Sequence, residues 1–342
     1  MSQLGLFDIE NRLQDLSKLK DPLEVLEKRI PWEVFRKDLK RALGREEPYR
    51  TGRPPFDPVL MFKVLVLQSL YNLSDHQIEF QIKDRLSFMR FLDLGAEARI
   101  PDEKTVWLYR ETLSQGKCGE RLFRRFDGYL EKAGYRAKKG MMVDATLVEV
   151  PRSRNTRQEN EQIKEGETPD SLSQNPNVLR QKDVNARWTQ KRGQTYFGYK
   201  NHINVDVKHK LIRRYTVTPA NVHDSRELGS LLDFWNMHPI VYGDAAYPNR
   251  EVEERFSVCG YVFRFNRKAR RGHPLTEGQK RRNRRLSRTR ARVEHVFGWM
   301  ERKTQGTLLR GIGLTRAALK IGFRNLVYNL SRYAYLEGVA TG

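Results

Sequence analysis

The sequence predicts an α/β protein in two parts: an all-α N-terminal part, then a mixed sheet flanked by helices. Up to residue 134 apolar residues recur every three or four positions, as on helices, and from residue 136 short β-rich runs take over. The charge is the third observation, because 64 Lys and Arg against 42 Asp and Glu give a net charge of +22. Such an excess predicts a polyanionic partner, with nucleic acid the first expectation.

The N-terminal part is expected to be helical throughout. Residues 1–50 predict one or two short amphipathic helices, and residues 51–135 predict a second helical segment, the expected DNA-binding domain. In that segment Asp57, Ser74 and Asp102 each precede an apolar run and are placed as helix N-caps. Short, capped helices fit a helix-turn-helix DNA reader and an ordinary helical bundle equally well, and both interpretations stay open.

From residue 136 to residue 335 the predicted order is three strands, helix, strand, helix, strand, helix. The strands are GMMVDATLVEV, two strands within YFGYKNHINVDVKHKLIRRYTVTP, PIVYGD and YVFRF. This order gives a mixed sheet flanked by helices and matches a ribonuclease H-like domain. Residues 152–187 are polar and nearly free of apolar side chains, so they are expected to be a flexible excursion from this domain.

Two aspartates lie where the predicted sheet would bring them together. Asp144 is in the middle of the apolar strand MMVDATLV, where a carboxylate is costly to bury unless it is paired or binds a metal ion. Asp244 ends the strand IVYGD, and ligands of α/β sheets collect beyond the carboxyl ends of strands. In a ribonuclease H-like order the first and fourth strands are neighbours. The two carboxylates would then repel each other unless a divalent cation neutralised them, which predicts a metal site.

The final basic helix supplies a third carboxylate. Between Lys280 and Arg292 eight basic residues precede the first acid, Glu294. With Val293 on the packed side and about 100° per residue, Glu294 falls on the shoulder of the apolar stripe, from which it can reach the strand ends. Three carboxylates provide only oxygen donors, which suit a hard cation. The predicted cofactor is therefore a pair of Mg²⁺ ions, with Mn²⁺ able to substitute.

Each carboxylate also has a structural interpretation. Asp144 could be satisfied by backbone N–H groups, and Asp244 could cap the turn into AAYPN. Glu294 could pair with Arg290, which precedes it by four residues on the same helix. The three acids together, in this order of elements and with this charge, favour the metal site.

Five motifs carry a resemblance to a known family: VDATLVEVPR, GQTYFGYKNHINVD, TPANVHDS, VYGDAAYP and RTRARVEHVFG. With them the chain resembles bacterial insertion-sequence transposases of the DDE class, in the insertion-sequence-five group. Residues 49–94 resemble the N-terminal domain of that group, and residues 136–335 its catalytic domain. The resemblance implies that Asp144, Asp244 and Glu294 are the catalytic triad and metal ligands. It also matches Arg290 to the arginine that precedes the family's glutamate.

Two positions depart from the family pattern. A tyrosine before the arginine and a lysine after the glutamate are replaced here by Ser287 and Glu301. Glu301 lies about two helical turns after Glu294 on the same face, so it places a negative charge where the family has a positive one. Impaired or altered strand transfer is the expected consequence.

Further basic and aromatic residues are expected to contact DNA. The basic run of the final helix is a predicted track for phosphates, and Trp188 either stacks on an unpaired base or anchors the excursion. Asp224 and Glu227 are favoured instead as a capping box of the helix that follows them. The candidate DNA and phosphate contacts are Arg290, Lys200, His202, Arg288, Arg292, Lys303 and Trp188.

The resemblance implies a DNA transposase that binds the inverted-repeat ends of an insertion sequence, then cleaves and transfers strands as a homodimer on DNA. Two other functions stay open: a metal-dependent nuclease without joining activity, and a non-catalytic DNA-binding regulator. The longest apolar stretch is too short to span a bilayer, so no membrane partner is expected. Only two cysteines and no visible secretory signal favour a reducing bacterial cytoplasm, with the protein at the nucleoid.

Overall fold

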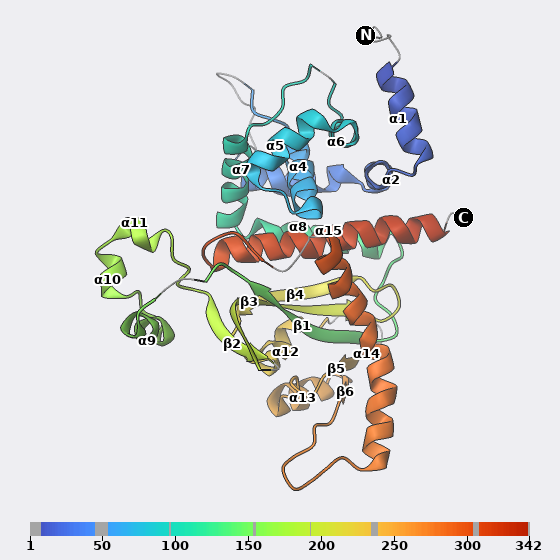
Figure 1. Ribbon diagram of the computed structural model, residues 1–342. Coiled ribbons are helices and arrows are strands. Elements are labelled where there is room, and N and C mark those ends of the chain that lie inside the picture. The colour runs from blue at the N-terminus through green and yellow to red at the C-terminus, as the bar shows by residue number, and fades with distance from the viewer. Residues whose placement is uncertain are drawn as a thin grey trace. The chain divides into compact units, whose positions relative to one another are not determined.

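The computed structural model describes residues 8–44, 54–95, 97–152, 155–191, 193–233, 239–303 and 308–340. Its elements form two units (Figure 1). One unit comprises Met1–Tyr129 with Leu326–Gly342, and the other comprises Leu130–Asn325. The last part of the chain, from Leu326 on, groups with the N-terminal helices. The domain bounds expected from the sequence, at residues 50, 135 and 335, stay a prediction.

The first unit is helical, as the sequence predicts. Asp57 and Asp102 cap their helices by accepting from backbone N–H groups, and Ser74 forms a capping box with Gln77. The segment after Ser74 forms two helices, because Arg85 adopts an extended conformation between them. The helices are α1 (Asp8–Lys18), α2 (Pro22–Arg29), the 3-10 helix η1 (Trp32–Phe35), α3 (Arg36–Ala42), α4 (Pro58–Tyr71), α5 (Asp75–Asp84), α6 (Leu86–Leu92), α7 (Glu103–Gln115) and α8 (Cys118–Lys132).

Helix α4 is the centre of this unit, which explains its apolar composition. Phe62 on α4 is fully buried and packs on Phe35 with ring centroids 4.7 Å apart. Lys63, the one basic residue of the stretch, is also buried. Its Nζ lies 2.9 Å from a Glu27 carboxylate oxygen and 5.4 Å from the ring centre of Trp32, so its charge is compensated.

The second unit is built on a six-stranded mixed sheet in the order β2-β3-β1-β5-β6, with β4 also paired to β3. The strands are β1 (Met141–Glu149), β2 (Arg187–Lys191), β3 (Gln194–Asp206), β4 (Ile212–Pro219), β5 (Ile240–Gly243) and β6 (Val262–Phe265). β3 runs antiparallel to β1, β2 and β4, whereas β1, β5 and β6 are parallel neighbours. Apart from β2, which the sequence analysis missed, the order is the predicted ribonuclease H-like one.

The segment expected to be a flexible excursion contains three short helices, α9 (Arg157–Glu165), α10 (Asp170–Ser173) and α11 (Pro176–Leu179). Asp183 connects its end to the rest of the unit. Its carboxylate accepts hydrogen bonds from the hydroxyl of Tyr199 at 2.7 Å and from the backbone N–H of Gly313 at 3.1 Å. The helices were missed because so few apolar residues mark them; Ile163 and Leu172 are the buried ones.

Helices cover the sheet of the second unit. They are the 3-10 helix η2 (Asp224–Glu227), α12 (Leu228–Leu231), α13 (Arg250–Ser257), α14 (Glu277–Lys303) and α15 (Leu314–Ala340), whose second half belongs to the first unit. Met141 and Val143 of β1 share a core with Leu228 and Phe256 of α12 and α13. Successive residues of a strand face opposite sides, so Asp144 faces away from that core, toward α14. No helix in the described ranges is both long and apolar enough to cross a bilayer.

Candidate active site

Asp144 lies on β1, and Asp244 directly follows β5, the parallel neighbour of β1. The ladder between β1 and β5 ends at Met142 paired with Tyr242. Continued for two residues, this register places Asp144 beside Asp244, and both then point to the same side of the sheet. Gly243 permits the close packing here, since a Cβ at that position would lie 2.9 Å from the ring of Phe265. The sequence-based expectation that the first and fourth predicted strands are neighbours is confirmed.

The carboxylate of Asp144 is poorly neutralised. Burial raises its pKa to about 6, and the negative charge of Asp244 acts in the same direction. The backbone N–H of Ala145, which donates to Oδ1 at 2.9 Å, and the charge of Arg290 oppose this rise. Asp244 accepts a hydrogen bond from the backbone N–H of Ala246 at 2.8 Å. A pair of acids with so little compensation is suited to receive a cation.

Arg290 connects this pair to the third predicted acid. Its Nη1 donates to Oδ2 of Asp144 at 3.4 Å, and its Nη2 lies 4.0 Å from Oε1 of Glu294. The predicted apolar stripe of α14 is present, with Val293 and Val296 fully buried, but the Glu294 side chain remains 65% exposed. Within the described residues no three acids, histidines or cysteines are close enough to hold a metal ion. The structure thus brings the two aspartates together and places Glu294 across an arginine from them.

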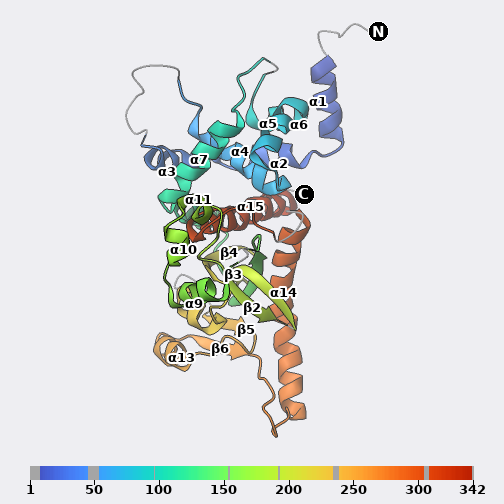
Figure 2. The ribbon, with the colours of Figure 1, turned by 60° about the vertical axis from the view of Figure 1, so that its left-hand side comes forward.

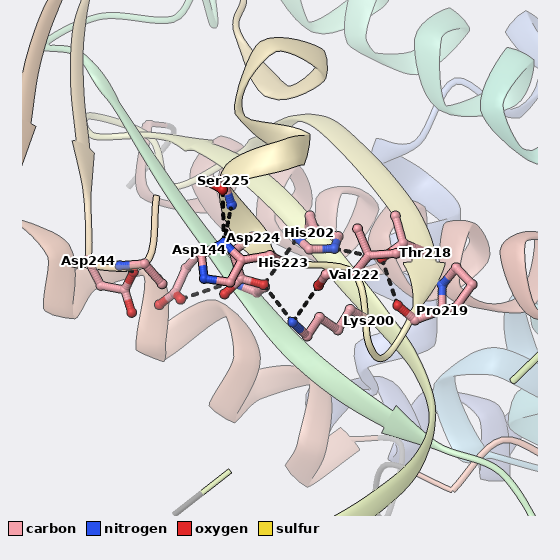
Figure 3. Close-up of polar contacts among 12 residues, drawn as sticks. Asp144, Lys200, His202, Thr218, Pro219, Val222, His223, Asp224, Ser225 and Asp244 are labelled. Atoms are coloured by element: carbon pink, nitrogen blue, oxygen red, sulfur yellow. Dashed lines mark hydrogen bonds and ion pairs between the residues drawn. The ribbon is translucent and has the colours of Figure 1, made fainter. Parts of the chain in front are cut away.

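A buried polar network borders the site on β3, the antiparallel neighbour of β1 (Figure 3). Lys200 donates to Oδ1 of Asp224 at 2.8 Å and to the carbonyl of Val222 at 2.7 Å. His202 has no exposed side-chain surface, and its Nε2 bonds the hydroxyl of Thr218 at 2.9 Å. Burial, with a smaller contribution from Lys200, lowers the pKa of His202 to about 4. His202 is therefore neutral and enclosed, so it cannot contact a phosphate directly. Lys200 is paired with Asp224.

The predicted capping box of Asp224 and Glu227 does not form. The N-cap of η2 is His223, whose Nδ1 accepts from the backbone N–H of Ser225 at 3.4 Å. Asp224 turns instead toward Lys200, because an ion pair with a largely buried lysine outweighs a single capping bond. In the view of Figure 3, Asp224 lies to one side of Asp144 and Asp244 to the other.

Tyr247, in the motif VYGDAAYP, was not predicted as a site residue, but the charges of Asp144 and Asp244 both act on it. Its side chain is fully buried, and its hydroxyl has no hydrogen-bond partner in the described part of the chain. Burial raises its pKa well above the ordinary value, and the charges of Asp144, Asp224 and Asp244 add to the shift. The hydroxyl therefore remains protonated, as a possible donor among three carboxylates.

Comparison with known proteins decides the family. A model described as "Transposase DDE domain" matches residues 135–330, which is more than half of the chain. The chain belongs to the DDE transposase family. A second model, "Transposase domain (DUF772)", matches residues 11–112. Among solved structures, the piggyBac transposase synaptic complex with hairpin DNA has a TM-score of 0.45 and 11% identity to this chain, covering 94% of it and 76% of that chain.

The family makes this chain a DNA transposase, an enzyme that cuts and joins DNA, of a kind that typically uses a divalent metal ion. The expected ribonuclease H-like catalytic domain and the expected family are confirmed. The assignment to the insertion-sequence-five group stays a prediction.

The remaining predicted DNA contacts of the transposase are on its surface. Arg288, Arg292 and Lys303 are exposed on α14, although Nη1 of Arg292 also donates to the carbonyl of Val207 at 3.2 Å. Trp188 on β2 is 42% exposed and packs against Phe197 with ring centroids 4.9 Å apart. It therefore contacts the sheet while part of its ring stays exposed, and the Arg152 guanidinium lies 5.6 Å from the ring centre.

Both departures from the family pattern lie on α14 of the transposase. Ser287 accepts a hydrogen bond from the side-chain amide of Asn266 at 3.1 Å. Glu301 is exposed. Ser287 thus has a structural partner, whereas the negative charge of Glu301 is presented to solvent.

Proposed function

We propose that this transposase binds the inverted-repeat ends of an insertion sequence, cleaves a phosphodiester bond there, and joins the freed 3′-hydroxyl to target DNA. The adjacent placement of Asp144 and Asp244 is the observation that carries the proposal. Two acids of one charge sign, side by side and poorly neutralised, are costly to the fold. Such an arrangement is expected where a reaction needs them.

The residues fit a divalent metal. Asp144, Asp244 and Glu294 offer oxygen donors alone, which suits Mg²⁺ or, in its place, Mn²⁺. When bound, two such ions activate the attacking oxygen and stabilise the leaving oxygen of an in-line displacement at phosphorus. The donor set is completed only if the Glu294 carboxylate turns toward the strand ends, since in this structure it lies beside Arg290.

Arg290 has two roles in this proposal. Without DNA it partly compensates the charge of Asp144 through the 3.4 Å contact. With DNA bound, its guanidinium would transfer to the two non-bridging oxygens of a phosphate, to which it can donate two hydrogen bonds in place of the single one it makes to Asp144. Asp144 would thereby be freed at the moment when the substrate arrives.

Lys200 and Asp224 hold the loop between β4 and η2 against β3, next to the catalytic strand. Because both groups are largely buried and paired with each other, we assign them to positioning rather than to phosphate contact. His202 supports the same loop through Thr218.

A joining assay tests the proposal. The full chain is supplied with labelled inverted-repeat ends that are already cut, a divalent metal and a supercoiled target plasmid. Label transferred covalently to the plasmid is the expected result, and it requires the 3′-hydroxyl. Cleavage of uncut ends without any joining of pre-cut ends would identify a nuclease, and binding without either reaction would identify a DNA-binding regulator.

Pairing of two ends by a homodimer is part of the proposal. Its test is the mass of the complex formed on labelled ends, measured without divalent metal. A complex of two chains and two duplexes supports it, and a stable complex of one chain and one duplex contradicts it.

A further inference from the structure

We propose that residues 264–288, here called the basic arm, bind the sugar-phosphate backbone of duplex DNA about five base pairs from the scissile phosphate, independently of base sequence. The inference rests on the proposed function and specifies its substrate contacts. The basic arm comprises the end of β6, the loop after it and the first half of α14. In Figures 1 and 2 this half of α14 extends beyond the strands of its unit, and the loop runs down to its far end.

The loop of the basic arm is fastened to α14 by specific hydrogen bonds. The Asn283 side chain accepts from the backbone N–H of Arg267 at 3.0 Å and donates to its carbonyl at 2.8 Å. Arg282 donates to the carbonyl of Phe265 at 2.9 Å. A loop held at its backbone in this way presents its side chains in a fixed arrangement, which lowers the entropy cost of binding.

The charge of the basic arm is almost uncompensated. It contains eleven Lys and Arg residues and one acid, Glu277, which is paired with Lys280 at 2.8 Å. Burial and then the guanidinium groups of Arg267, Arg285 and Arg264 hold the pKa of Arg282 below its ordinary value, so these four arginines lie close together. Like charges gathered on a pre-formed surface are costly unless a polyanion neutralises them.

The helix sets the distance from the basic arm to the catalytic acids. Arg282 precedes Glu294 by twelve residues on the continuous helix α14, a span of about 18 Å at about 1.5 Å per residue. Phosphates along one DNA strand are about 3.4 Å apart, so the same span covers about five base pairs. A duplex whose scissile phosphate lies at Glu294 can therefore reach the basic arm along the axis of α14.

The basic arm is expected to bind the sugar-phosphate backbone of DNA rather than the edges of the bases. Exposed arginines on a protruding arm, with few apolar side chains between them, match the repeated charge of phosphates. The contact should therefore add the same binding free energy to a cognate end and to an unrelated duplex.

The double variant Arg267→Ala/Arg285→Ala tests this proposal in binding assays without divalent metal. Affinity for labelled end duplexes is measured by fluorescence anisotropy over a range of salt concentrations. The slope of log affinity against log salt should fall by about two, roughly one for each lost phosphate contact. Affinity should drop on the order of tenfold for cognate and scrambled duplexes alike. An unchanged slope, or a loss confined to the cognate duplex, would overturn the proposal.

Two further variants distinguish the effect of the fixed loop conformation from the effect of positive charge alone. Asn283→Ala removes the two hydrogen bonds between the helix and the backbone of Arg267 without removing a charge, and it should weaken the binding of cognate and scrambled duplexes alike. Arg250→Ala removes an arginine that is 91% exposed and paired with Glu254 on α13, and should leave the slope unchanged. Equal losses of DNA affinity in Asn283→Ala and Arg250→Ala would contradict a specific role of the basic arm in DNA binding.

Shortened duplexes test the predicted distance. Two duplexes are made, each ending two or three base pairs from the scissile phosphate, one on each side of it. The duplex truncated on the side that meets the basic arm should bind wild type and the double variant with equal affinity. Persistence of the difference on both short duplexes would refute the placement. Because these measurements need no cleavage, a catalytically inactive protein would defeat the proposed function while leaving this inference intact.

Discussion

Nη1 of Arg290 donates to Oδ2 of Asp144 at 3.4 Å, although 146 residues separate them in the chain. The contact joins strand β1 to helix α14 at the point where the sheet presents its two aspartates. The same guanidinium lies 4.0 Å from Glu294. An arginine thus lies between Asp144 and Glu294, two of the three acids proposed as metal ligands.

Asp144→Asn should stabilise the folded protein at neutral pH. Its pKa is raised from 3.8 to about 6, so the folded state binds the proton more tightly than the unfolded state does. Wild-type stability from this group is therefore lost as pH rises from about 4 through about 6. The variant lacks that loss. Its free energy of unfolding should therefore equal that of wild type at about pH 4 and exceed it by ~2–3 kcal/mol above about pH 7.

Chemical denaturation of both proteins across this pH range measures that difference. Comparing the two proteins is essential, because His202, whose pKa is lowered, has the opposite effect and destabilises both equally as pH falls below about 6.5. A difference that does not vary with pH would show that Asp144 is not the strained group inferred here.

Gly243→Ala should disturb the neighbouring Asp144 and Asp244 through packing. The added methyl group would lie 2.9 Å from the Phe265 ring and 3.0 Å from Cγ2 of Val143. We expect a loss of stability of ~1–3 kcal/mol and reduced cleavage with unchanged DNA affinity. Gly229→Ala is the control, since its new Cβ would meet Val252 at an ordinary 3.9 Å. Equal thermal stability of the two variants would contradict the packing argument.

Lys200→Met should be strongly destabilising because it leaves Asp224 largely buried without its partner. The expected loss is ~3 kcal/mol, measured by urea unfolding, and replacing Asp224 by Leu as well should recover much of it. Lys280→Met removes a lysine from an exposed pair with Glu277 and should cost less than ~1 kcal/mol. Similar losses of stability in the two lysine variants would mean that the buried ion pair contributes no more to stability than the exposed one.

Glu301→Lys should strengthen DNA binding. Glu301 is exposed on the face of α14 that also carries Glu294, so a lysine there is free to meet a phosphate. The slope of log affinity against log salt should become steeper by about one. If the slope stays constant while strand transfer rises, the residue acts on the reaction rather than on affinity.

Much of the architecture could be predicted because its signals are local. Asp57, Ser74 and Asp102 cap helices as expected, since a cap is defined by residues a few positions apart. Helical periodicity identified the buried side of α14 for the same reason. The adjacency of Asp144 and Asp244 followed from the order of elements, which restricts the possible sheets to very few.

What was missed depends on contacts between distant residues. The ion pair of Lys200 with Asp224 spans 24 residues, and no local pattern distinguishes it from the capping box that was favoured. The enclosure of His202 and of Tyr247 arises from packing of the sheet, which alternating polar and apolar letters do not reveal. The position of Glu294 across Arg290 is likewise set by side-chain orientation rather than by helical angle.

Metal-dependent cleavage by Asp144→Asn is the most direct test of the account. Labelled inverted-repeat ends are incubated with Mg²⁺ and with wild type, Asp144→Asn or the exposed control Asp170→Asn. We predict that Asp144→Asn binds the ends as wild type does and cleaves them at least a thousandfold more slowly, a loss of roughly 4 kcal/mol in transition-state stabilisation, while the control cleaves normally. Cleavage by Asp144→Asn at the wild-type rate would contradict the assignment of the catalytic site.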